Sequence, residues 1–166
     1  MQITKAGDGD IELLTKLGRE TFIESFGYLY KPEELQEFLA KKYNYEAQSA
    51  EINAQNSIVY IASFNGKPAG YARVCNCRIP VQNLDAGAME LHKLYVLQAY
   101  QNQGIGRELI KTALQKINTT IYVGVWSKNL NAQRLYSSFG FTICGGYKFY
   151  VGTQADDEFI MKRTKI

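Results

Sequence analysis

The spacing of apolar residues changes along the chain, and each change marks an expected structural element. Residues 2–6 fit a short strand, and residues 11–26 carry apolar side chains at helical spacing, which predicts a helix. A break at residues 27–31 precedes a second helix that Pro32 opens, because proline and the acidic residues after it suit a first helical turn. Another helix is expected over residues 45–54.

The rest of the chain alternates between β-rich and amphipathic segments, which are bounded by turn residues. Expected strands cover residues 57–64, 69–78, 89–96, 120–126, 141–150 and 157–162, and expected helices cover residues 104–117 and 129–139. This order predicts an α/β (α+β) fold in which helices flank a mixed sheet. At 166 residues the chain is expected to form a single domain, 1–166.

Composition places the chain among ordinary soluble globular proteins, with 46% apolar and 21% charged residues. It has no apolar run long enough for a membrane span, and its first residues lack the apolar core of a signal peptide. Cys75, Cys77 and Cys144 are odd in number and have no zinc-site spacing. We therefore expect reduced thiols, no metal and a cytoplasmic location.

Charge is unevenly distributed. Residues 1–60 hold ten acidic and six basic side chains, whereas residues 61–166 hold six and thirteen. Chance explains such a split about as well as function does. The functional interpretation is a polyanionic ligand on the C-terminal part and a cationic substrate near the N-terminal part. No Lys/Arg cluster with interleaved aromatic residues is present, so nucleic acid is not an expected partner.

A glycine-containing turn follows the expected strand 89–96 and reads Gln101-x-x-Gly104-x-Gly106. Glycines let the backbone approach a ligand closely, and the start of the helix that follows favours a phosphate. The turn lacks the Lys-Ser/Thr pair of a Walker loop and the third glycine of a dinucleotide fingerprint. Alone it is weak evidence for a phosphate site, because many glycine turns only end strands.

A second motif, Asn129-x-x-Ala132-x-x-Leu135-Tyr136-x-x-x-Gly140-Phe141, follows the expected strand 120–126. Together the two motifs resemble the GNAT superfamily of acetyl-CoA-dependent N-acetyltransferases. The resemblance covers nearly the whole chain in element order. It implies a GNAT fold: a twisted, mostly antiparallel sheet of about seven strands, whose splayed central strands form the acetyl-CoA cleft.

A narrower likeness is to the bacterial PaiA-type spermidine/spermine N-acetyltransferases. It rests on residues 21–26, on Gly124-Val125-Trp126, and on two segments of the tail, residues 149–152 and 157–161. This likeness implies that the acceptor is a small, polyamine-like primary amine. It also admits a homodimer.

The family resemblance assigns cofactor roles to both motifs and to the strand before them. Leu94, Tyr95 and Val96 would lie along the pantetheine arm, with the Leu94 N–H facing the thioester oxygen. The other expected acetyl-CoA contacts are Gln101, Asn102, Gln103, Gly104, Ile105, Gly106, Arg107, Asn129, Ala132 and Tyr136. Arg107, Lys128 and Arg134 are candidates for further phosphates, although each could equally be a solvated surface cation.

The resemblance also suggests the catalytic groups. Tyr136 would protonate the departing CoA thiolate, and a phenol suits a thiol leaving group. Glu90 and His92 are alternative bases for the amine proton; with Leu94 and Val96 they would share one strand face. The competing interpretations are a core aromatic residue for Tyr136 and a structural hydrogen-bonded pair for Glu90 and His92.

Acceptor recognition is expected from the first helices. Glu20 and Glu24 are spaced to meet a cationic amine from one helix face, and Tyr28 and Tyr30 can pack against an alkyl-ammonium chain. The alternative is that the acids are solvated and the tyrosines fill gaps in the packing.

The resulting hypothesis is an acetyl-CoA-dependent N-acetyltransferase that acts on a small-molecule amine. Acetyl transfer is expected by direct attack in a ternary complex, because no nucleophile with an adjacent base is arranged to accept the acyl group. Two alternatives stay open: an acetyltransferase for protein N-termini or lysines, and a non-catalytic CoA-binding sensor.

Overall fold

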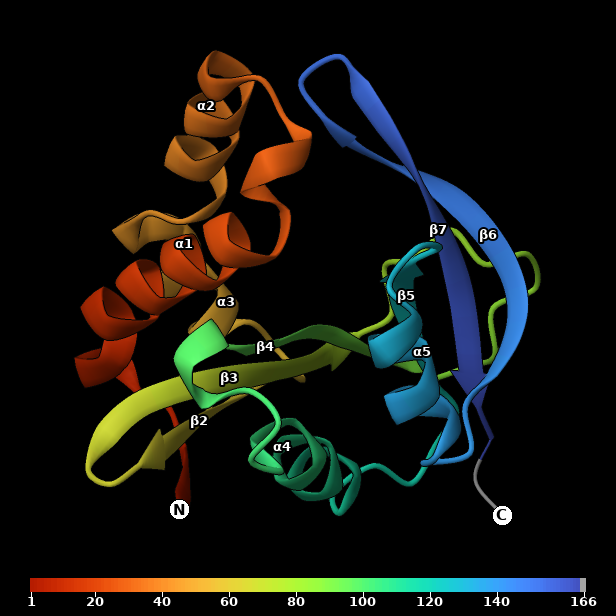
Figure 1. Cartoon of the computed structure of the whole chain (residues 1–166). Helices are drawn as coiled ribbons and strands as arrows, with labels where there is room; N and C mark the ends of the chain where they lie inside the picture. Colours follow the sequence, from red (N-terminus) through yellow and green to blue (C-terminus); the bar gives the residue numbers. More distant parts are fainter. Residues whose placement is uncertain (165–166) are drawn as a thin grey trace.

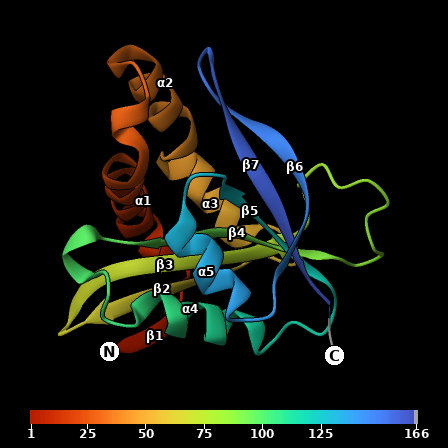
Figure 2. The ribbon, with the colours of Figure 1, turned by 45° about the vertical axis from the view of Figure 1, so that its right-hand side comes forward.

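The computed structural model describes residues 1–164 and contains one seven-stranded sheet with helices on both faces (Figures 1 and 2). The spatial order of the strands is β1-β2-β3-β4-β5-β7-β6, and every neighbouring pair is antiparallel except β4 and β5. The strands are β1 (Gln2–Lys5), β2 (Ile58–Phe64), β3 (Lys67–Asn76), β4 (Met89–Val96), β5 (Ile121–Trp126), β6 (Thr142–Val151) and β7 (Gln154–Arg163). The predicted fold class is confirmed.

Helices occupy the connections between strands. They are α1 (Ile11–Phe26), α2 (Pro32–Lys42), α3 (Tyr45–Asn53), α4 (Ile105–Leu114) and α5 (Leu130–Ser137), with short 3-10 turns η1 (Asp8–Asp10), η2 (Gly27–Leu29) and η3 (Gln98–Tyr100). Figure 1 shows α1, α2 and α3 on one side of the sheet and α4 on the other. None of the helices within residues 1–164 is long and apolar enough to cross a membrane.

The main core lies between the sheet and α4. The inner side of α4 contributes Ile105, Leu109, Ile110 and Ala113, all of them buried, and α5 adds Tyr136 to the same cluster. A smaller core joins α1 to the opposite face of β2 and β3. The sheet is therefore covered on both faces where β2, β3 and β4 run together.

Within residues 1–164, β4 and β5 form the only parallel pair of strands, and this pair has the fewest paired residues. β4 and β5 are in register at Met89 with Ile121 and at Glu90 with Tyr122, and then they separate (Figure 1). From Leu91 onward the edge of β4 that faces β5 has no strand partner among the described residues. Its backbone groups are therefore available to a ligand that inserts between the two strands.

A β-bulge interrupts β4 at His92. Arg73 pairs with Lys93 and Val74 pairs with Leu91, so His92 has no opposite residue on β3. The extra residue shifts the alternation of side chains. Leu94 and Val96 consequently pack with the α4 core, on the face opposite Tyr95, and the prediction that they share a face with Glu90 and His92 was wrong.

The last hairpin also differs from its prediction. β7 begins at Gln154 rather than at residue 157, because the turn after Val151 consists only of Gly152 and Thr153. Gly152 has a φ of 56°, and a side chain there would collide with Glu34 of α2. The glycine thus lets α2 approach the tip of the hairpin, which rises beside it in Figure 2.

Candidate active site

Two cavities meet where β4 and β5 part. The first, of about 840 Å³, lies along η3 and the start of α4, and we call it the turn cavity. The second, of about 820 Å³, lies under α1, α2 and α3 and is called the aromatic cavity. Leu94, Trp126 and Tyr136 line both, so a ligand in one cavity can contact a ligand in the other.

The turn cavity ends at the N-terminus of α4. Gly104 caps this helix with a φ of 83°, a conformation that glycine adopts without strain. The first intrahelical hydrogen bond runs from the Glu108 N–H to the Gly104 carbonyl. The N–H groups of Ile105, Gly106 and Arg107 therefore have no acceptor inside the helix, and these residues line the cavity. Such a helix start fits a pyrophosphate.

The charged side chains around the turn cavity are mostly basic. Arg107, Lys128 and Arg134 line it, and Glu24 is the one acidic residue among the lining residues described. Glu24 accepts a 2.7 Å hydrogen bond from the Gln98 N–H and so holds η3 in place. The excess of cations suits a polyanionic ligand. Glu24 therefore lines the turn cavity and does not line the aromatic cavity.

Asn129 and Tyr136 stand at the junction of the cavities. The Asn129 side-chain oxygen accepts from the Ala132 N–H at 3.1 Å and caps α5. This cap fixes the start of the short helix that carries Tyr136. Tyr136 is 6% exposed, and burial, with a smaller contribution from Glu158, raises the pKa of its phenol. The phenol therefore stays protonated across the working pH range.

Ten aromatic side chains line the aromatic cavity. They are contributed by Phe22, Phe26, Tyr30, Phe38, Tyr43, Tyr95, Trp126, Tyr136, Tyr147 and Phe149. Carboxyl groups of Glu51, Glu90, Asp156 and Glu158 also line it. Lys41, Lys42, Arg78 and Lys93 line another part of the cavity. The part lined by rings, Asp156 and Glu158 suits an organic cation, because ring faces and carboxylates both attract positive charge.

Glu90 is buried at the floor of the aromatic cavity. It is 6% exposed, and its carboxylate accepts a 2.8 Å hydrogen bond from the Arg78 N–H. Burial raises the pKa of the Glu90 carboxyl group, whereas that hydrogen bond and the charges of Arg78 and Arg73 oppose the rise. A carboxylate with a raised pKa is a stronger base than an exposed one.

Glu158 is a candidate residue that the sequence analysis missed. It lies on β7, and its carboxylate accepts a 2.8 Å hydrogen bond from the Tyr147 hydroxyl. Burial raises the pKa of Glu158, and Asp156 and Glu90 add to the effect. The pair reaches the cavity past Gly124 of β5, where a Cβ atom would collide with both side chains. A glycine inside a strand was the available signal.

Two hydrogen bonds join the helices that line the aromatic cavity to the β6–β7 hairpin. The Tyr30 hydroxyl donates to Asp156 at 2.8 Å, and the Thr153 hydroxyl donates to Glu34 at 2.7 Å. Tyr28, in contrast, is 73% exposed and lines the turn cavity, and Glu20 lies exposed on α1 outside both cavities. Of the four acceptor residues expected from sequence, only Tyr30 lines the aromatic cavity.

His92 lies between two guanidinium groups. Arg73 Nη1 is 2.9 Å from Nδ1, and Arg78 Nη2 is 3.1 Å from Nε2. Burial, followed by the charges of Lys93, Arg73 and Arg78, lowers the pKa of His92 to about 2. The ring is therefore neutral. Both guanidinium groups can only donate, and a neutral ring accepts at one nitrogen. The shorter contact, to the buried Arg73, assigns Nδ1 as the acceptor and the proton to Nε2.

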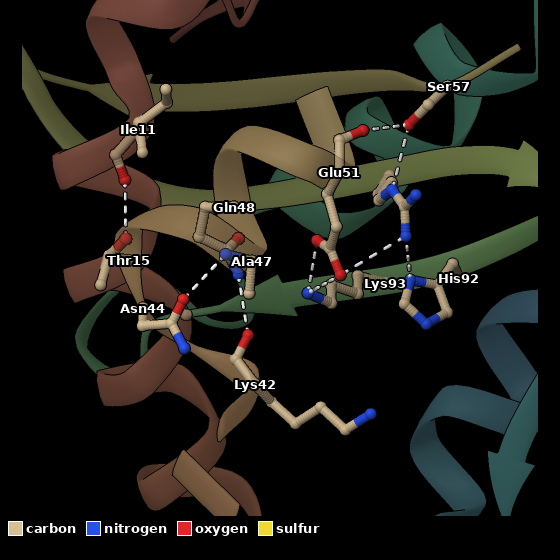
Figure 3. A network of polar contacts seen from close by, with 12 residues as sticks. Ile11, Thr15, Lys42, Asn44, Ala47, Gln48, Glu51, Ser57, His92 and Lys93 are labelled. Atoms are coloured by element: carbon tan, nitrogen blue, oxygen red, sulfur yellow. Dashed lines mark hydrogen bonds and ion pairs between the residues drawn. The ribbon is translucent and has the colours of Figure 1, made fainter. Parts of the chain in front are cut away.

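A buried ionic cluster supports this arrangement (Figure 3). Glu51 of α3 contacts Lys93 at 2.7 Å and Arg73 at 3.4 Å, and Arg73 Nε donates to Ser57 at 3.0 Å. Together these contacts anchor α3 to β3 and β4. Within residues 1–164 no group of three metal-ligating side chains is found, and all three cysteines are free thiols.

Comparison with known proteins places this site in a family. Residues 19–141 match the family model described as acetyltransferase (GNAT) family, and this span contains both motifs. The chain belongs to the GNAT acetyltransferase family. It is accordingly an acetyl-CoA-dependent N-acetyltransferase.

Of three similar proteins, two match nearly the whole chain and one matches part of it. An uncharacterized N-acetyltransferase from Lactobacillus delbrueckii subsp. lactis is 26% identical and aligns over 100% of this chain and 98% of its own length. A spermine/spermidine N(1)-acetyltransferase from Bacillus subtilis is 29% identical over 38% of this chain and 45% of its own length. The crystal structure of a PaiA N-acetyltransferase from Thermoplasma acidophilum with coenzyme A has a TM-score of 0.76 at 21% identity and 98% coverage of both chains.

We expect Gly124→Ala to lower kcat/KM for the amine acceptor by at least about tenfold, because the added methyl group displaces Tyr147 and Glu158. The KM for acetyl-CoA should change little, since the turn cavity is untouched. Steady-state kinetics with each substrate varied in turn measures both effects. Gly145→Ala is the matched control, because its Cβ would lie at an ordinary 3.6 Å from Ile160. Equal kinetics for the two variants would contradict the assignment.

The raised pKa of Glu158 predicts a pH-dependent stability. The folded chain retains the Glu158 proton to a higher pH than the unfolded chain does, so this contribution to stability is present below the ordinary pKa of 4.5 and is lost as pH rises through the folded-state value. Glu158→Gln removes that loss and should gain stability relative to the wild type as the pH rises above 4.5. Urea unfolding at a series of pH values measures the free energy of unfolding of both proteins. Glu37→Gln, at an exposed position, is the control. Parallel curves for the wild type and Glu158→Gln would contradict the prediction.

Proposed function

We propose that the protein transfers the acetyl group of acetyl-CoA, bound in the turn cavity, to a primary amine of a small, polyamine-like molecule in the aromatic cavity. The observation that carries this proposal is the meeting of a basic, amide-lined cavity with an aromatic, carboxylate-lined cavity where β4 and β5 part. Because the two cavities meet, both substrates would lie side by side, and transfer would proceed by direct attack in a ternary complex.

On the donor side, the open amides at the start of α4 would hold the pyrophosphate, and the unpaired edge of β4 would hold the pantetheine arm. The residues in these roles are Leu94, Tyr95, Val96, Gln101, Asn102, Gln103, Gly104, Ile105, Gly106 and Arg107, with Asn129 and Ala132 from α5. The Leu94 N–H would donate to the thioester oxygen, and such a backbone donor contributes about 3 kcal/mol to a tetrahedral transition state. The coenzyme A bound to the Thermoplasma relative supports the donor assignment.

Tyr136 is the proposed acid. It lines both cavities, so its phenol can contact a ligand in either one. The buried phenol is protonated and would donate its proton to the departing thiolate.

Glu90 is the proposed base, acting directly or through a water molecule. His92, the alternative expected from sequence, is the poorer candidate. Its Nδ1 lone pair faces Arg73, and its Nε2 carries the proton, which leaves no lone pair for an amine. Glu158 lies in the same cavity and would bind the acceptor ammonium, with Asp156 and Tyr30 further along the same side.

A small acceptor is favoured over a protein because of how the aromatic cavity is covered. A polypeptide substrate needs an open groove, whereas the Tyr30–Asp156 and Glu34–Thr153 hydrogen bonds join the helical side to the hairpin. The polyamine class is supported by the carboxylates and rings of the cavity and by the Bacillus relative's name.

An amine panel tests the proposal. CoA thiol release should be measured with spermidine, putrescine, dibasic amino acids and peptides with free N-termini. We expect turnover with small cationic amines to exceed that with peptides by at least about tenfold in kcat/KM. If acetyl-CoA binds but no amine raises thiol release above hydrolysis, the proposal fails, and preference for peptides would favour the protein-directed alternative.

Tyr136→Phe tests the proposed acid. Removing the hydroxyl should lower kcat by at least about tenfold while the dissociation constant for acetyl-CoA stays within about twofold, because the ring remains. Calorimetric titration and steady-state kinetics measure the two quantities. Tyr45→Phe, at an exposed position on α3, is the control. An unchanged kcat in Tyr136→Phe would exclude the tyrosine from the chemistry.

A further inference from the structure

We propose that the end of the aromatic cavity between α2, α3 and the β3–β4 loop is a binding subsite for an oxyanion, a carboxylate or a phosphate group. The residues that form it are His92, Arg78 and Lys42, backed by the buried Arg73 and Lys93. In the context of the proposed function, the anion is carried on the acceptor itself, so that the acceptor is an amine chain with an acidic group.

The contacts of His92 supply the first argument. Its Nδ1 accepts from Arg73, so its Nε2 is a donor, yet the guanidinium of Arg78 lies 3.1 Å from that same nitrogen. Two donors thus face each other with no acceptor between them. Both belong to residues that line the aromatic cavity. An oxyanion that accepts from the Nε2–H and from Arg78 would satisfy both groups.

The balance of charge supplies the second argument. Lys42, Arg73, Arg78 and Lys93 all act on the His92 ring, as the causes of its lowered pKa show. Glu51 directs its carboxylate to Lys93 and Arg73, both more than nine-tenths buried. Within residues 1–164 neither Arg78 nor Lys42 forms an ion pair. This end of the cavity therefore carries uncompensated positive charge.

Glu90 does not remove that excess. Its carboxylate accepts from the backbone N–H of Arg78 rather than from the guanidinium, and together with Glu51 it offsets only two of the four cations. Because Arg73 and Lys93 are buried, water screens their charges poorly and the field reaches the cavity. An anion entering here would meet a prearranged set of donors at little reorganisation cost.

The two ends of the cavity have opposite polarity. Asp156 and Glu158 line the hairpin side, whereas Arg78 and Lys42 line the side of α2 and the β3–β4 loop. A ligand with an ammonium group at one end and an oxyanion at the other matches both. This narrows the proposed polyamine-like acceptor to a chain such as a dibasic amino acid, in which a carboxylate accompanies two amines.

Matched acceptors test the subsite through catalysis. Lysine and cadaverine differ only by a carboxylate, as do ornithine and putrescine. We expect the carboxylate to raise kcat/KM by at least about tenfold in the wild type. Arg78→Gln should reduce that ratio below about threefold, and Arg78→Lys should restore part of it. Lys67→Gln, at an exposed position on the β2–β3 hairpin, should keep the wild-type ratio. If Arg78→Gln does not fold, Lys42→Gln replaces it.

The source of the anion is tested in the same assay. Acetate or inorganic phosphate is added to the cadaverine reaction, with potassium chloride at equal ionic strength as the control. Stimulation by either oxyanion would show that the subsite takes a free anion, whereas preference for lysine without stimulation would place the anion on the acceptor. Equal kcat/KM for lysine and cadaverine, with no stimulation, would overturn the subsite.

A binding measurement separates this proposal from the proposed function. His92 is the only histidine in the chain, so its ring signals in an NMR spectrum are unambiguous. Titration with inorganic phosphate should shift them saturably in the wild type and not in Arg78→Gln. Saturable shifts in a protein that acetylates no amine would support the subsite and refute the proposed function. If the protein acetylates cadaverine and no anion changes the rate or the spectrum, the proposed function is supported and the anion subsite is refuted.

Discussion

The parting of β4 from β5 is the constraint on which the site depends. The two strands are held together at only two positions, and β4 is held along its other edge by β3. α4 and α5 fill the space below the gap with apolar side chains and begin at residues that face it. The gap therefore exposes backbone groups of a central strand without exposing the main core. Few other places in a sheet offer unpaired main-chain donors inside a folded domain.

Burial of charge is the second constraint, and it links stability to chemistry. Carboxyl groups of Glu90 and Glu158 and the cations Arg73 and Lys93 all lie away from bulk water. Unpaired buried ions are strongly destabilising, so each is held by a specific partner, such as Glu51 for the cations or Tyr147 for Glu158. Burial of these groups costs stability, and it also shifts their pKa values away from those of surface residues.

Features that arise within one stretch of chain could be predicted from sequence, and features that join distant strands could not. The Gly104 turn and the Asn129 cap depend on neighbours a few residues away, so their motifs are readable. Glu158 reaches the cavity only because Gly124, on another strand, leaves room for it. Likewise, the His92 bulge depends on its pairing with β3, which no local pattern encodes. Glu20 and Glu24 lie on the same helix, yet tertiary packing leaves Glu20 exposed, whereas Glu24 accepts a hydrogen bond from the Gln98 N–H of η3.

The hydrogen bonds between the helical side and the hairpin have a consequence for how the enzyme can diversify. Tyr30, Glu34, Thr153 and Asp156 all lie outside the two cofactor motifs, in segments near the ends of the described chain. Under the proposed function, substitutions in these segments would reshape the cover of the acceptor cavity and leave the donor cavity unchanged. Donor recognition and acceptor choice would then be carried by separate segments, so that new acceptors could be accommodated without changes to the catalytic residues.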